Sequence, residues 1–303
     1  MTPLSTKILE NYQVRKTRKQ KTAFIELMQE HYPDLKIQEG GLLKSRNIII
    51  GNPKKADVVL AAHYDTCSTL PLANFITPRS PFLTVLYSML LVIPIFLLVL
   101  FLNIGLNTLS DSQWLHYFIS VALYFGLLAL LVFGPANKHT ANDNTSGVIT
   151  LCELMERLPD ELKEKAAFVF FDHEETGLFG SQYFRKKNQK KMQTKLLINF
   201  DCVSDGDYIM FATTKQARKT YGEAFKNAFV AGNGKTIVMD KLEKVYYPSD
   251  HAGFPVAVAV AALKHKKYIG YYIDRIHTAK DTMFDEKNID MLCSCMHSLL
   301  ENM

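Results

Sequence analysis

The sequence has few cysteines, and their spacing does not pair them. Five occur in 303 residues, no two of them form a CxxC motif, and their number is odd. They are Cys67, Cys152, Cys202, Cys293 and Cys295. This pattern is not typical of a disulfide framework, so we expect the protein to reside in a reducing compartment.

A basic stripe interleaved with aromatic residues is also missing. The formal net charge is only +5, and the Lys and Arg residues are scattered, with short runs at residues 15–19 and 185–187. Nucleic-acid-binding domains concentrate such charge on one face, so we expect no nucleic-acid partner. The basic runs instead indicate solvated helix faces or a surface that faces a membrane. The chain is long enough for one large α/β domain with a full core.

The first residues lack the apolar stretch of a signal peptide, so none is expected. Long uncharged runs occur further along, over residues 82–102 and 114–133. Each has about 20 residues, enough to cross roughly 30 Å of hydrocarbon. Soluble helices of that length usually keep a polar face, so we predict a transmembrane hairpin rather than two buried core helices.

Lysine and arginine are absent from residues 103–113, which join the two runs. Arg79 precedes the first run, Lys138 follows the second, and the rest of the chain is rich in both residue types. By the positive-inside rule, the joining loop is external and the flanking segments are cytoplasmic. The sequence therefore predicts a multi-pass protein of the inner, or cytoplasmic, membrane with its large domain in the cytoplasm.

Several hydrophobic runs end on side chains that bind metals. Residues 58–62 lead into His63-Tyr64-Asp65, residues 167–171 into Asp172-His173-Glu174-Glu175, and residues 196–200 into Asp201. Ligand sites of open α/β sheets lie at the carboxyl ends of the strands. We therefore expect these side chains to meet at one edge of a sheet, together with Asp143 and His277 from two further motifs.

The order of the patterns predicts an α/β fold with a mostly parallel mixed sheet sandwiched by helices. His63 and Asp143 should meet in space, although both apolar runs lie between them in the sequence. A helical hairpin returns to where it left. We therefore expect one discontinuous domain, residues 1–80 and 135–303, interrupted by a transmembrane hairpin over residues 82–133.

The side chains at this edge match the chemistry of a two-metal site. Zinc accepts His nitrogen and carboxylate oxygen, and paired metals share a bridging group. The candidate ligands are two histidines and three carboxylates: His63, Asp143, Glu175, Asp201 and His277. One bridging carboxylate leaves one His and one carboxylate for each metal. Glu174 remains free to act as the general base on water, and Asp65 can orient the imidazole of His63.

These motifs resemble those of the co-catalytic zinc aminopeptidase family, which also includes glutamate carboxypeptidase and the glutaminyl cyclases. The resemblance rests on His63-Tyr64-Asp65, Asp143-Asn144-Thr145-Ser146-Gly147, Glu174-Glu175-Thr176-Gly177, Asp201 and His277-Thr278, in the family's order. It implies a zinc exopeptidase-like fold and two zinc ions per chain. It also implies that Asp143 bridges the zinc ions, that Glu175 and His277 hold one and His63 and Asp201 the other, and that Glu174 is the base. The apolar hairpin is a departure from the soluble members of the family.

The sequence thus predicts a membrane-anchored, zinc-dependent exopeptidase, of aminopeptidase type, that acts on short peptides. One alternative is a single-zinc acyl transferase of the glutaminyl cyclase kind, which His63 and Asp201 disfavour because they complete a second metal site. Another is a non-catalytic membrane scaffold with a peptidase fold, which the complete ligand set disfavours. The preferred terminal residue, the exopeptidase direction, the physiological metal, the oligomeric state and whether substrates come from the membrane stay open.

Overall fold

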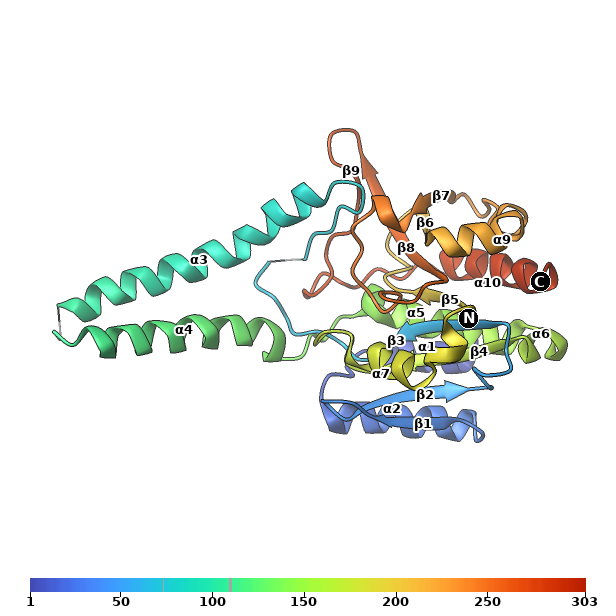
Figure 1. The fold of residues 1–303 in the computed structure, drawn as a ribbon, viewed down its shortest axis with the longest axis horizontal. Coiled ribbons are helices and arrows are strands. Elements are labelled where there is room, and N and C mark those ends of the chain that lie inside the picture. Colours follow the sequence, from blue (N-terminus) through green and yellow to red (C-terminus); the bar gives the residue numbers. More distant parts are fainter. Residues whose placement is uncertain (73, 109–110) are drawn as a thin grey trace.

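The computed structural model describes residues 1–72, 74–108 and 111–303. Within these residues, nine strands form one mixed sheet in the order β1-β2-β4-β3-β5-β8-β6-β7, with β9 paired to β8 (Figure 1). The strands are β1 (Lys36–Gly40), β2 (Ser45–Ile50), β3 (Val58–His63), β4 (Ala166–Phe171), β5 (Leu196–Phe200), β6 (Tyr208–Thr213), β7 (Thr236–Lys241), β8 (Ala257–Lys266) and β9 (Gly270–Tyr272). The α/β class with a mixed sheet is confirmed.

The centre of the sheet is parallel and buried on both faces. Strands β4, β3, β5 and β8 are neighbours and run in the same direction. The pairs β1–β2, β2–β4, β6–β8 and β8–β9 are antiparallel. Every residue of β3, β4 and β5 is buried. Continuous apolar runs are what such strands require, because successive side chains point to opposite faces that are both covered. Strand β1 was not predicted, since as an exposed edge strand it carries no apolar run.

Helices cover both faces of the sheet. They are α1 (Pro3–Asn11), α2 (Arg18–His31), α5 (Gly147–Arg157), α6 (Asp160–Glu164), α7 (Phe179–Lys187), α8 (Gln189–Met192), α9 (Lys215–Ala228) and α10 (Glu286–Glu301). The larger core packs α1, α2, α5, α9 and α10 against one face. On the other face, Phe184 of α7 and Met192 of α8 pack against Val59 and Val169.

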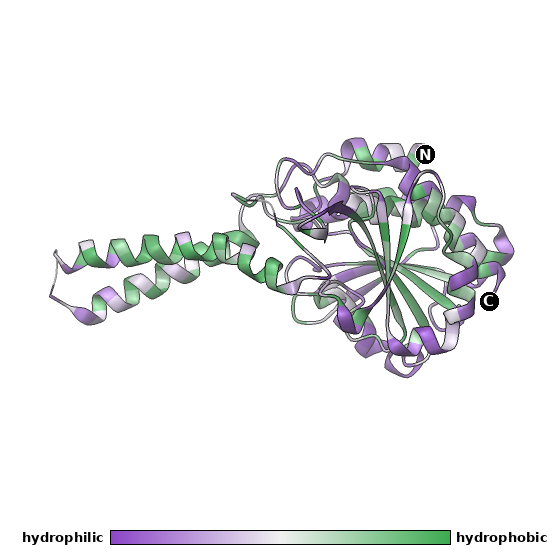
Figure 2. Ribbon diagram, turned by 90° about the horizontal axis from the view of Figure 1, so that it is seen from above, coloured by the Kyte–Doolittle hydropathy of each residue, from purple (hydrophilic) through white to green (hydrophobic). Residues whose placement is uncertain are grey.

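Two apolar helices, α3 (Pro81–Asn107) and α4 (Gln113–Phe133), project from the rest of the chain as an antiparallel pair (Figures 1 and 2). Both are long and apolar enough to cross a membrane, and only 6% of the most apolar window of each is buried. Phe82, Trp114 and Phe133 are each more than 70% exposed. Because these helices do not pack into the core, a buried-core role does not explain their composition.

Candidate functional site

Three neighbouring parallel strands deliver side chains to one edge of the sheet. His63 is the last residue of β3, Asp172 follows β4 and Asp201 follows β5. The register places His63 beside Phe171 of β4. The carboxyl ends of the three strands are therefore level, and the chain segments that follow them converge on one site, as the sequence predicted.

The segment between α4 and α5 brings Asp143 to the same edge. The Asn144 side-chain amide donates to the backbone oxygen of Phe200 at 2.9 Å, which ties this segment to the end of β5. A Cβ atom on Gly147 would lie 2.4 Å from that same oxygen, so only glycine fits there. The carboxylate of Asp281 accepts the backbone N–H of Asp143 at 3.0 Å. Asp143 is thus fixed from two sides.

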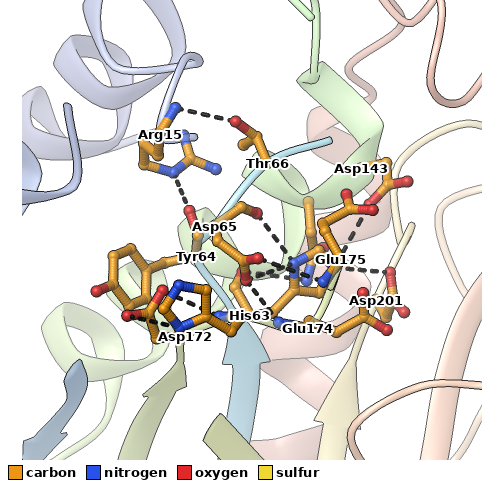
Figure 3. Close-up of polar contacts among 12 residues, drawn as sticks. Arg15, His63, Tyr64, Asp65, Thr66, Asp143, Asp172, Glu174, Glu175 and Asp201 are labelled. Atoms are coloured by element: carbon orange, nitrogen blue, oxygen red, sulfur yellow. Dashed lines mark hydrogen bonds and ion pairs between the residues drawn. The ribbon is translucent and has the colours of Figure 1, made fainter. Parts of the chain in front are cut away.

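The five predicted ligands lie together, and Figure 3 shows four of them, His63, Asp143, Glu175 and Asp201. Asp143 lies between His63 and His277. His63 Nε2 is 3.4 Å from Asp143 Oδ1 and 3.5 Å from Asp201 Oδ1. His277 Nε2 is 3.0 Å from Asp143 Oδ2 and 3.3 Å from Glu175 Oε2. Each oxygen of the Asp143 carboxylate therefore faces a different imidazole.

This donor set fits zinc. Two ligand atoms bound tetrahedrally to one zinc, each about 2.0–2.2 Å from it, lie about 3.3–3.5 Å apart. Three of the four distances from the histidine nitrogens, 3.3, 3.4 and 3.5 Å, match this separation, and the fourth, from His277 to Asp143, is shorter at 3.0 Å. Among the described residues, the buried Glu175 Oε1 and Asp201 Oδ1 have no hydrogen-bond partner. Buried carboxylates without partners are costly unless a cation neutralises them.

Glu174 lies beside these ligands and, together with them, lines a small pocket that is described below. Burial raises the pKa of Glu174 well above its usual value, and the charges of Glu175 and Asp201 raise it further. The charge of the buried Asp250 also raises the pKa of Glu174. Burial raises the pKa of Asp250 itself to about 7. A carboxylate with a raised pKa accepts a proton more readily than an exposed one.

Asp65 contacts the site in a way that the sequence did not reveal. His63 Nδ1 lies 3.1 Å from the backbone oxygen of Asp65 and 3.7 Å from its carboxylate. The carboxylate instead accepts the backbone N–H groups of Glu174 and Glu175. Asp65 therefore orients the imidazole of His63 through its backbone oxygen and the turn after β4 through its carboxylate.

Arg15 supports the segments that carry the site residues, and its role was not predicted from the sequence. Its side chain is fully buried and donates from Nε to the backbone oxygen of Tyr64 at 2.6 Å (Figure 3). It also reaches the Thr145 hydroxyl at 3.1 Å. The expectation that the basic run at residues 15–19 is a solvated face is wrong for Arg15. Burial lowers the pKa of Arg15 to about 10, which leaves the guanidinium charged at neutral pH.

A second network holds the segment that carries the two glutamates. Lys21 Nζ contacts Asp172 Oδ1 at 2.7 Å, and both side chains are buried. His173 lies 3.0 Å from Lys21 Nζ through Nε2 and 3.0 Å from the Ser45 hydroxyl through Nδ1. Helix α2 and strand β2 thereby fix the end of β4 through Lys21, Ser45 and His173.

Cys67 is a neighbour of the site that sequence reasoning missed. Its sulfur lies with the ligand atoms of Glu175 and His277 in a group that could hold a metal ion. Burial raises the pKa of the Cys67 thiol well above its usual value. The only sequence signal was its position two residues after Asp65.

Backbone strain also concentrates here. Four non-glycine residues beside the site have positive φ angles: His173 at 56°, Leu178 at 61°, Cys202 at 55° and His277 at 63°. Such conformations cost free energy and tend to gather at functional sites.

A small pocket of about 310 Å³ opens onto the candidate ligands. Its apolar walls include Ile76, Leu178, Tyr247 and Ile276, and Asn74 adds a polar group. Among its described lining residues there is no Lys or Arg. The pocket is therefore rich in carboxylates and lacks fixed cationic side chains.

Comparison with known proteins identifies the family. The sequence profile of peptidase family M28 matches residues 124–299, which is more than half of the chain. No curated protein sequence matches the chain. Among solved structures, it is similar to a glutaminyl cyclase from Porphyromonas gingivalis, with 15% identity, a TM-score of 0.60, and 99% of this chain and 96% of that chain covered.

Two other structures give the same picture of the fold. One is a Zn-dependent exopeptidase from Parabacteroides distasonis, with 15% identity, a TM-score of 0.56, and 99% and 94% of the two chains covered. The other is the LapA aminopeptidase from Legionella pneumophila, with 16% identity, a TM-score of 0.54, and 98% and 67% covered. The family match, in contrast to these distant likenesses in fold, is specific. The chain belongs to peptidase family M28 and has the fold of a zinc-dependent peptidase.

Proposed function

We propose that the protein is a membrane-anchored dizinc aminopeptidase. The observation that carries the proposal is the position of Asp143, whose two carboxylate oxygens lie 3.4 Å and 3.0 Å from the imidazoles of His63 and His277. A single carboxylate between two separate His–carboxylate pairs is the arrangement that two metals sharing a bridge require.

In this proposal His63 and Asp201 hold one zinc ion, His277 and Glu175 hold the other, and Asp143 serves both. Bound zinc supplies a Lewis acid that polarises the scissile carbonyl and makes water a better nucleophile at neutral pH. The remaining chemistry falls to the side chains. Asp281 keeps Asp143 in place through the backbone N–H of Asp143.

Glu174 is the proposed general base. It takes a proton from the attacking water and delivers it to the nitrogen of the departing peptide, so that one carboxylate serves both transfers. Its raised pKa suits this exchange, and its backbone N–H is held by Asp65 at 3.0 Å. Asp65 is thus a positioning residue for the base.

The lining of the pocket favours an aminopeptidase over a carboxypeptidase. A carboxypeptidase needs a cation to bind the terminal carboxylate, and the described residues that line this pocket include no Lys or Arg. A free amino terminus carries positive charge and suits a pocket that contains Glu174, Glu175 and Asp201. The volume of about 310 Å³ has room for little more than one terminal residue.

We propose further that α3 and α4 anchor the enzyme in the inner membrane, with residues 1–80 and 135–303 as one cytoplasmic domain. Ser68, three residues after Asp65, donates to the backbone oxygen of Val132 at 2.6 Å, and Lys16 contacts both. The end of α4 is therefore joined to the loop that carries Asn74, which lines the pocket. This proximity supports short peptides produced near the membrane as substrates.

The test is hydrolysis of a panel of aminoacyl chromophores by the detergent-solubilised protein, with zinc measured on the same sample. Glu174→Gln should abolish turnover while both zinc ions remain bound, whereas the exposed control Glu161→Gln should behave as wild type. One zinc ion per chain with cyclisation of amino-terminal Gln would favour the acyl transferase. Two bound zinc ions without turnover of any amino- or carboxy-terminal substrate would favour the non-catalytic membrane scaffold.

A further inference from the structure

A second, larger hollow lies beside the catalytic pocket. Its volume is about 930 Å³, and its walls come from α7, α8 and the turn between β1 and β2. The residues lining it include Leu42, Phe179, Tyr183, Arg185, Lys186 and Lys187. We call it the α7 groove.

The α7 groove and the catalytic pocket share one thin wall. Gly177 and Leu178 line the catalytic pocket, and the next residue, Phe179, lines the groove. A Cβ atom on Gly177 would lie 3.3 Å from the Phe179 ring, so that ring packs directly against the wall. Arg185 Nη1 donates to the backbone oxygen of Gly253 at 2.8 Å, five residues after Pro248 of the catalytic pocket. The residues Gly177, Leu178 and Phe179 therefore separate the two hollows, and a peptide that left the catalytic pocket over Gly177 would reach the groove.

The charge of the groove is of one sign. Arg185, Lys186 and Lys187 line it, whereas its lining residues include no Asp or Glu. Within the described part of the chain, none of these three side chains has a carboxylate within 4.0 Å. Lys187 Nζ lies 5.7 Å from the centre of the Tyr183 ring, within the range of a cation–π contact. The catalytic pocket is acidic and its neighbour is basic, so the two together match a peptide with a cationic start and an anionic continuation.

We propose that the α7 groove binds carboxylates of the peptide substrate that lie on the carboxyl side of the cleaved bond. The proposal rests on the proposed function, because the amino terminus must occupy the catalytic pocket. Helix α7 runs from Phe179 to Lys187, about 12 Å at 1.5 Å per residue. An extended peptide covers that length in about four residues. The preferred substrates are therefore short peptides with acidic side chains, or a free carboxyl terminus, about four to six residues from the amino terminus.

The experiment compares amidated hexapeptides that begin Leu-Ala-Ala-Ala and end in Glu-Glu or Gln-Gln, using the full chain in detergent. In the wild type, kcat/KM should be about five- to tenfold higher for the acidic peptide, the scale of two exposed ion pairs. In Lys186→Gln/Lys187→Gln this ratio should fall to about 1. The matched control Lys54→Gln/Lys55→Gln removes two exposed lysines from the opposite end of β3 and should keep the ratio. Raising the salt concentration to 0.5 M should also reduce the ratio.

Equal kcat/KM for the two peptides in the wild type, or a ratio that survives in Lys186→Gln/Lys187→Gln, would overturn the proposal. If neither peptide is cleaved, the proposed function has failed, and the groove is tested by fluorescence anisotropy with the same peptides labelled. Tighter binding of the acidic peptide that is lost in the double variant supports the groove. Equal binding of both peptides overturns it.

Discussion

The carboxylate of Asp65 accepts the backbone N–H of Glu174 at 3.0 Å, which joins the end of β3 to the turn after β4. Its second oxygen accepts the N–H of Glu175 at 3.3 Å. One side chain therefore sets the position of the proposed base and of a proposed ligand at the same time. The side chain acts through the backbone, so its effect should differ from that of a residue that touches substrate.

Asp65→Asn should lower kcat about 10- to 100-fold and weaken zinc binding by a similar factor, as loss of a group behind metal ligands typically does. The amide offers one acceptor and places an NH₂ group against the second N–H. Steady-state kinetics and zinc competition with a chelator measure both effects. Asp57→Asn, on the exposed turn before β3, is the control. If zinc affinity and kcat are both unchanged in Asp65→Asn, Asp65 does not position the base or the metal ligand.

Metal content distinguishes the two proposed zinc positions. The wild type should bind two zinc ions per chain, and His63→Ala or His277→Ala should each retain one, because each histidine faces a different oxygen of Asp143. Elemental analysis after dialysis against micromolar zinc gives the count. His297→Ala, on the exposed side of α10, should retain both. A wild type with a single zinc ion contradicts the dizinc assignment.

Arg15→Met should destabilise the part of the chain outside α3 and α4 by about 2–4 kcal/mol, because it leaves the buried backbone oxygen of Tyr64 and the hydroxyl of Thr145 without their donor. Arg15→Lys keeps the charge but not the planar fork, and should fall between wild type and Arg15→Met. Urea unfolding in detergent measures the change. Arg18→Met, at a site with 67% side-chain exposure, should cost far less. Equal losses at the two positions would show that burial of Arg15 contributes nothing.

The ion pairs of Lys235 with Asp207 and Asp285 should make the free energy of unfolding depend on pH. Burial alone would lower its pKa, but hydrogen bonds to Asp207 and Asp285 outweigh burial and raise it. For Asp285, burial would raise the pKa, and the bond from Lys235 lowers it. The Asp285 contribution is present above its unfolded pKa of about 3.9 and is lost as pH falls through the folded value. The Lys235 contribution is lost as pH rises through its own raised pKa.

Lys235→Met should therefore lower the free energy of unfolding by about 1 kcal/mol between roughly pH 5 and pH 9. The value is small because Asp207 and Asp285 are partly exposed and solvent screens their charge. The difference from wild type should shrink below about pH 4. Urea unfolding of both proteins across this range is the measurement. Lys226→Met, exposed on α9, serves as the control. A difference that stays constant down to pH 3 would contradict the role of the Asp285 charge.

Much of the catalytic edge could be predicted from the sequence because each ligand follows a buried strand or sits in a distinctive motif. His63 and Asp201 end continuous apolar runs, and such runs form central parallel strands. Strand direction alone places His63 and Asp201 at the same edge, whereas Asp143 and His277 were assigned from their motifs. Arg15 could not be predicted, because a basic residue in a basic run has the pattern of a solvated face, and only tertiary packing buries it.

The α7 groove could not be predicted from the sequence for a related reason. It is built from residues far apart in sequence, such as Leu42 on the β1–β2 turn and Lys187 on α7. Strand β1 has no alternation of apolar residues, so its pairing and the turn beside it were not predicted. Surfaces that depend on how an edge strand packs carry little periodic signal.

The proposed orientation of α3 and α4 rests on the distribution of charge and can be measured directly. Asp111 should lie outside the cytoplasmic membrane, because residues 103–113 contain no Lys or Arg while both flanking segments are basic. All five native cysteines are buried, so background labelling should be low. Asp111→Cys should react with a membrane-impermeant maleimide on intact cells, whereas Lys241→Cys should react only after the membrane is opened. Labelling of Lys241→Cys on intact cells with protection of Asp111→Cys would reverse the topology and place the zinc site outside. Labelling of both only after lysis would mean that α3 and α4 do not cross the membrane at all, and the hairpin would then lie along the surface beside the catalytic edge.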